Sequence, residues 1–83
     1  MKTGNELISD ERATHEAKGW TAAHDDAHKN GELALNAAQM IFGYEDQWGL
    51  TNKTFEEGGR IRQLVVAGAL IAAEIDRLQR KQL

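Results

Sequence analysis

The spacing of apolar residues predicts a long helix over the last part of the chain, from Arg60 to Gln82. Six positions alternate spacings of three and four residues, which places them on one side of a helix. They are Ile61, Leu64, Gly68, Ile71, Ile75 and Leu78. Val66, Leu70 and Ala73 lie on roughly the opposite side. A helix that is apolar on every side must be buried on every side, and this run is shorter than the roughly 20 residues that span a bilayer.

Two shorter helices are predicted before it. Thr3 and Glu6 have the spacing of a capping box, in which each side chain binds the other residue's backbone N–H. The first helix is therefore expected from Asn5 to Lys18, with its end at Gly19. A second helix is expected from Gly31 to Phe42, where apolar residues again recur at helical spacing.

The segments between the helices are predicted to be irregular. They run from Trp20 to Lys29 and from Tyr44 to Lys53. Thr54 and Glu57 have the spacing of a second capping box. The pair Gly58-Gly59 predicts a break, because a glycine costs about 1 kcal/mol in a helix interior. The long helix is therefore expected to begin only after these glycines.

Residues 1–83 are expected to form one all-α domain, a three-helix protomer with a long C-terminal helix. A chain of 83 residues without cysteine has a small core, no disulfide and no cysteine-based metal site. Two short helices cover only part of the long one, so we expect it to oligomerise with other copies. The pairs Gly68–Ala72 and Ala69–Ala73 predict the seam, because small residues let helices approach closely. The alternative for these residues is packing within the chain.

The charge of the chain excludes some partners. Ten basic residues against thirteen acidic ones give a net charge of −3, unlike the basic surface of a duplex-binding domain. The N-terminus lacks the apolar segment of a signal peptide. We therefore expect a cytoplasmic protein that binds neither duplex nucleic acid nor a membrane.

Two sets of side chains are candidates for holding a metal. His24, Asp26 and His28 lie close together in the sequence, and two histidines four residues apart share one face of a helix. The preferred alternative is a solvated loop whose aspartates cap the next helix. Glu32, Glu74 and Asp76 are the second set, because carboxylates from two packed helices suit magnesium. Their preferred alternative is surface ion pairs, Glu74 with Arg77 and Asp76 with Arg80.

The two tryptophans are candidates for binding a planar ligand. Trp20 and Trp48 both fall in predicted connections, where their rings would stack on a nucleobase. The preferred alternative is that each closes a small core. For the same ligand, the phosphate contacts are assigned to Arg12, Arg60 and Arg62, and the polar selectivity to His24 or Asp25.

Several segments resemble a group of short phage and prophage proteins. These segments are Glu11-Arg12, Gly19-Trp20, the run from His24 to His28, Gly31 to Ala34, and Leu64 to Leu78. The order of these features is more distantly similar to phage MazG-like nucleotide pyrophosphohydrolases. Those are all-α oligomers whose paired acids hold magnesium against a nucleoside triphosphate.

The MazG-like resemblance implies a role for three carboxylates. Glu32 would match one acid of the first metal-binding helix, and Glu74 with Asp76 the later acidic pair. Gly31 and Asn36 stand where the family has further glutamates, so a binding protein is favoured over an enzyme.

These observations give three hypotheses for function. The first is a phage-encoded, oligomeric binder of a nucleotide-like ligand, which sequesters a host signalling nucleotide as counter-defence. The second is a residual pyrophosphohydrolase that uses magnesium as its cofactor. The third is an inhibitor that binds a host protein through an acidic surface.

Overall fold

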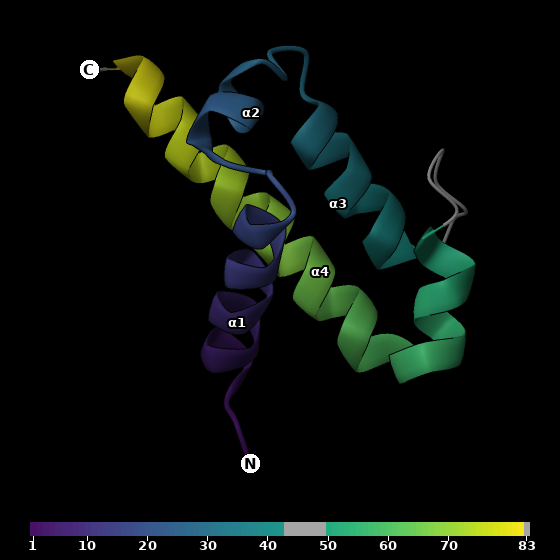
Figure 1. Cartoon of the computed structure of the whole chain (residues 1–83). Helices are drawn as coiled ribbons and strands as arrows, with labels where there is room; N and C mark the ends of the chain where they lie inside the picture. The colour runs from purple at the N-terminus through teal and green to yellow at the C-terminus, as the bar shows by residue number, and fades with distance from the viewer. Residues whose placement is uncertain (43–49, 83) are drawn as a thin grey trace.

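The computed structural model describes residues 1–42 and 50–82, and the side chains of 1–41 and 59–81. Within these residues the chain forms four helices and no strand (Figure 1). The helices are α1 (Gly4–Ala17), α2 (Ala22–Asp26), α3 (Glu32–Phe42) and α4 (Leu50–Gln82). Helices α1, α2 and α3 all pack on α4. The predicted all-α class and the long C-terminal helix are therefore confirmed.

Helix α1 begins as the sequence predicted. The Thr3 hydroxyl accepts the Glu6 N–H at 3.2 Å, and the Glu6 carboxylate accepts the Thr3 N–H at 3.0 Å. This reciprocal pair satisfies two N–H groups that a helix start leaves without a partner. At the other end, Gly19 adopts φ 94°, a left-handed conformation that favours glycine and ends the helix.

The prediction that residues 20–29 form an irregular connection is wrong, because they contain α2. Thr21 caps this helix, and its hydroxyl accepts the His24 N–H at 3.5 Å. The helix is only five residues long, which is too short to show an apolar period. The protomer therefore has four helices in its described part, where three were expected.

Helix α4 consists of two helical segments joined at a kink, which lies where the sequence predicted a break. The first segment starts at Leu50, so the predicted irregular connection is wrong for residues 50–53, and Thr54 lies inside a helical segment and not at its start. The break lies at Gly59, with φ 62° and ψ −151°, a combination that is essentially restricted to glycine. The glycine pair was therefore a correct signal for the break, and the long helical segment begins after it as predicted.

The core lies between α3 and α4. Leu33, Ala37 and Met40 of α3 pack against Val66, Ala67 and Leu70 of α4. Met40, Ala67 and Ala69 are at most 1% exposed. Figure 1 shows α3 along one side of α4 and α1 on another, so two sides of the long helix are covered by its own chain.

A third side of α4 keeps an apolar row at the surface. Its residues are between 42% and 50% exposed, and they are Leu64, Ile71, Ile75 and Leu78. The expectation that α4 is buried on every side is therefore not met within one copy of the chain. In the described residues, no helix combines the length and the apolar character needed to cross a membrane.

The small residues of α4 pack within the chain. A Cβ atom built on Gly68 would lie 2.6 Å from Cδ1 of Ile8, so α1 already occupies this position. Ala69 is completely buried. For Gly68 and Ala69 the structure therefore favours the alternative of packing within the chain. Oligomerisation itself stays a prediction.

Candidate functional site

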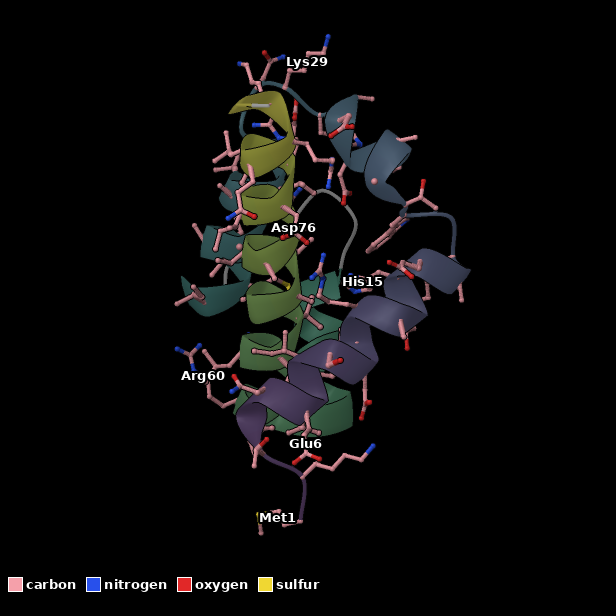
Figure 2. The ribbon with its side chains drawn as sticks, turned by 90° about the vertical axis from the view of Figure 1, so that its left-hand side faces the viewer. Met1, Glu6, His15, Lys29, Arg60 and Asp76 are labelled. Atoms are coloured by element: carbon pink, nitrogen blue, oxygen red, sulfur yellow. The ribbon has the colours of Figure 1, made fainter. Side chains whose placement is uncertain are left out.

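A cavity of about 600 Å³ lies between the four helices and contains most of the polar residues singled out in the sequence. Its apolar wall comes from the core, including Leu33, Met40 and Val66. Its polar wall comes from α1, from α2 and from the side of α4 that carries Arg62, Asp76 and Arg80. In Figure 2, His15 of α1 and Asp76 of α4 lie on the two sides of this space. The volume is within the roughly 300–1,000 Å³ typical of small-molecule sites.

Four aromatic and imidazole rings follow one another along the polar wall. The ring centroids of His15 and Trp20 are 4.6 Å apart. Trp20 and His24 are nearly parallel, with 14° between their planes and 6.2 Å between centroids. His24 and His28 follow at 4.6 Å. The backbone sets the start of this row, because the Trp20 N–H donates to the His15 carbonyl at 2.9 Å and folds the chain back after α1.

Glu11 and His15 form a buried pair at one end of the cavity. Both residues are less than 9% exposed, and His15 Nε2 lies 2.7 Å from the Glu11 carboxylate. Burial lowers the pKa of His15, and Lys18 and Arg62 act in the same direction, whereas Glu11 opposes them. The neutral imidazole therefore donates its Nε2–H to Glu11. Neither residue was a predicted site residue, although their i,i+4 spacing on a helix with few apolar residues was a usable signal.

Three arginines around the cavity are bound to carboxylates of other helices. Arg12 of α1 binds Asp76 of α4 at 2.7 Å. Arg62 of α4 binds both carboxylate oxygens of Glu11 through its two terminal nitrogens. Arg80 of α4 binds Asp26 of α2 at 2.7 Å.

The predicted phosphate-binding arginines are therefore separated by the structure. Arg12 and Arg62 line the cavity. Arg60 instead donates to the Ile41 carbonyl and to the Gln63 side chain, and it is not among the residues that line the cavity. Its role as a phosphate ligand has no support from this placement.

The predicted ring-binding residues are placed in part. Trp20, His24 and Asp25 all line the cavity. Asp25 is buried, at 8% exposed. Trp48 lies outside the described residues.

The three carboxylates assigned to magnesium do not converge. Glu32 and Asp76 line the cavity, but Glu74 does not. Two nitrogens of Arg77 bind the Glu74 carboxylate, at 2.5 and 3.3 Å. The predicted pairing of Glu74 with Arg77 is thus confirmed, but its expected place at the surface is wrong, because the two side chains are only 13% and 8% exposed. The predicted pairing of Asp76 with Arg80 is wrong, because α1 brings Arg12 to Asp76 and α2 brings Asp26 to Arg80.

Of the three predicted transition-metal ligands, the structure brings two together and places the third elsewhere. His24 and His28 come together, with 3.3 Å between their Nε2 atoms. Asp26 points instead to Arg80, whose hydrogen bond lowers the pKa of the Asp26 carboxyl. Among the described residues, no group of three or more His, Cys, Asp or Glu side chains is arranged to hold a metal.

In comparisons with known proteins, no protein-family model, no curated protein and no solved structure matches this chain.

Proposed function

We propose that this protein binds a nucleotide-like small molecule in the cavity between its four helices. The observation that carries the proposal is the row of His15, Trp20 and His24 rings along the wall of a cavity of about 600 Å³. A planar heterocycle gains about 1–3 kcal/mol by stacking on an aromatic side chain. The buried carboxylate of Asp25 also lines the cavity. It would accept hydrogen bonds from ring N–H or amino groups of the ligand.

The charges around the cavity favour a ligand with a single phosphate. Five carboxylates line the cavity: Glu11, Glu16, Asp25, Glu32 and Asp76. Four permanently basic side chains stand against them: Arg12, Lys18, Arg62 and Arg80. A triphosphate would add several negative charges to a site that is already slightly acidic. One phosphate is matched by the forked guanidinium of Arg12 or Arg62.

Hydrolysis of a nucleotide is not part of the proposal. The carboxylates that the MazG-like resemblance would use are divided between the cavity and the Arg77 side chain. Magnesium-dependent hydrolysis would require these carboxylates to meet at one ion, whereas binding without turnover does not.

The proposal is tested by titrating the four nucleoside monophosphates into the protein in a calorimeter. We expect at least one purine monophosphate to bind, and Trp20→Leu to weaken it about tenfold or more through the lost stacking. Arg62→Gln should weaken it as well. Arg60→Gln is the matched control, because Arg60 lies two residues before Arg62 and does not line the cavity.

Two results would overturn this function. One is the absence of binding by every monophosphate at millimolar concentration, with the protein shown to be folded by circular dichroism. The other is an equal loss of affinity in Arg60→Gln and Arg62→Gln, which would place the ligand outside the cavity.

We also propose that α4 pairs with another copy of the chain through its exposed apolar row. The residues of the row, Leu64, Ile71, Ile75 and Leu78, are seven, four and three positions apart, spacings that place them on one side of a helix, as in helices that pair. Analytical ultracentrifugation should show a dimer or larger species for the wild type and a monomer for Ile71→Lys. Leu35→Lys is the control, because Leu35 of α3 is 61% exposed but lies outside the row. A wild type that stays monomeric at about 100 μM would contradict this proposal, because it excludes a dimer with a dissociation constant below about that concentration.

A further inference from the structure

His24 and His28 present their Nε2 atoms to each other at the wall of the cavity. The two nitrogens are 3.3 Å apart, and the ring planes are tilted by 58°. Helix α2 ends at Asp26, but Ala27 keeps a right-handed helical conformation and the His28 N–H donates to the Asp25 carbonyl at 3.0 Å. The turn therefore continues far enough to place His28 over His24.

Each of the two imidazoles has a carboxylate on its other side. His24 Nδ1 lies 3.3 Å from the Asp25 carboxylate. His28 Nδ1 lies 3.8 Å from the Glu32 carboxylate. In metal sites, a carboxylate that accepts the Nδ1–H of a histidine fixes the tautomer and leaves Nε2 free to bind the metal. The Asp25 carboxylate is within hydrogen-bond distance for this function, whereas the Glu32 carboxylate at 3.8 Å is close to His28 but beyond that distance.

The separation of the two Nε2 atoms fits one tetrahedral ion. Zinc–nitrogen bonds of about 2.0–2.1 Å at a tetrahedral angle place two ligand nitrogens about 3.3–3.4 Å apart. In the structure the two Nε2 atoms lie within hydrogen-bond distance of each other, and the tautomers of the rings decide which one donates. To bind one ion, both rings would carry their proton on Nδ1, so that both Nε2 lone pairs face the metal.

We propose that His24 and His28 form a two-imidazole site for a divalent transition metal, zinc above all, that opens on the cavity. Imidazole nitrogen suits zinc, copper and nickel, whereas magnesium prefers oxygen ligands. No third His, Cys, Asp or Glu side chain joins them within the described part of the chain. A four-coordinate ion would therefore keep two positions for water or for a ligand in the cavity, one more than in catalytic zinc sites, which have three protein ligands.

Trp20 adds to the order of this site. Its ring lies nearly parallel to that of His24, with 14° between the planes, and so restricts how that imidazole turns. A phosphate oxygen is a suitable ligand for the open positions, but the metal site does not depend on the proposed nucleotide. It is tested with zinc alone.

The first experiment is a calorimetric titration of the untagged protein with Zn²⁺. We expect one ion per chain, and loss of the binding signal in both His24→Gln and His28→Gln. Asp25→Asn should bind about 10–100-fold more weakly, because it leaves the ligands but removes the carboxylate behind His24. Asp26→Asn is the matched control and should bind as the wild type does, since Arg80 already holds that carboxylate.

The second experiment uses the wild type and so does not depend on the folding of variants. The protein has three histidines, and long-range ¹H–¹⁵N spectra distinguish their ring nitrogens. Zinc should shift the Nε2 signals of His24 and His28 and leave those of His15, whose Nε2 is bound to Glu11. The proposal is overturned if no zinc binds, if both glutamine variants bind normally, if Asp26→Asn abolishes binding, or if His15 shifts instead.

Discussion

Replacing Gly68 by alanine tests how α1 packs on α4. The added Cβ would lie 2.6 Å from Cδ1 and 3.0 Å from Cγ1 of Ile8, so the Ile8 side chain must move. Overpacking of this kind typically costs about 1–3 kcal/mol. Against this, alanine is favoured over glycine in a helix by about 0.8–1.0 kcal/mol. We therefore expect Gly68→Ala to lower the free energy of unfolding by about 0–2 kcal/mol.

A double-mutant cycle with Ile8→Ala separates the two terms. Ile8→Ala removes the atoms that the new Cβ would meet. In that background only the helix preference remains, so Gly68→Ala should stabilise the protein by about 1 kcal/mol. The coupling energy between the two positions should then equal the overpacking cost of about 1–3 kcal/mol.

Urea denaturation of the four proteins measures this cycle, at one protein concentration so that any self-association affects all four alike. A coupling energy near zero, with Gly68→Ala stabilising in both backgrounds, would show that Ile8 does not cover Gly68. Gly68 would then be available to a second copy, as the small-residue pattern first suggested. Sedimentation of the same samples would show whether the subunit number changes.

Two further predictions concern His15 and the break in α4. Burial lowers the pKa of His15 below its unfolded value of 6.5, so the unfolded chain binds more protons and stability should fall as the pH drops below 6.5. Urea titrations at pH 7.5 and 5.5 should show a smaller loss for His15→Gln than for the wild type, and an equal loss would assign the effect elsewhere. Gly59→Ala should cost about 1–3 kcal/mol, because φ 62° with ψ −151° strains any other residue. Gly4→Ala is its control, since an added Cβ meets no atom within 4 Å at either position, and equal effects of the two changes would refute the backbone argument.

Local signals in the sequence predicted the local parts of this fold. The capping box of Thr3 and Glu6, the helix end at Gly19 and the break at Gly59 depend on residues close together in the chain, and all three are present. Helix α2 was missed for the same reason, because five residues are too few for an apolar period to appear. Thr21 was the signal that remained, as a helix-capping residue before a short polar run.

The candidate site was harder to predict because its pairs are distant in the sequence. Arg12 and Asp76 are 64 residues apart, and Glu11 and Arg62 are 51 apart. Spacing within a helix suggested Arg80 as the partner of Asp76, but the packing of α1 on α4 brings Arg12 to Asp76 instead. By contrast, the meeting of His24 and His28 follows from their spacing of four residues, once a helical turn is known to contain them.

The ion pair between the exposed Arg62 and the buried Glu11 has a consequence for the binding of anions. An anion that takes the Arg62 guanidinium must displace Glu11, which is 5% exposed and has His15 as its neighbour. Arg62 is one of the charges that lower the pKa of His15, and Glu11 is the one that raises it. Neutralising Arg62 therefore shifts His15 towards its protonated form, which compensates the buried carboxylate. If the phosphate of the proposed ligand binds Arg62, its uptake should be accompanied by uptake of a proton at His15, so acidification should favour this binding while it weakens the fold.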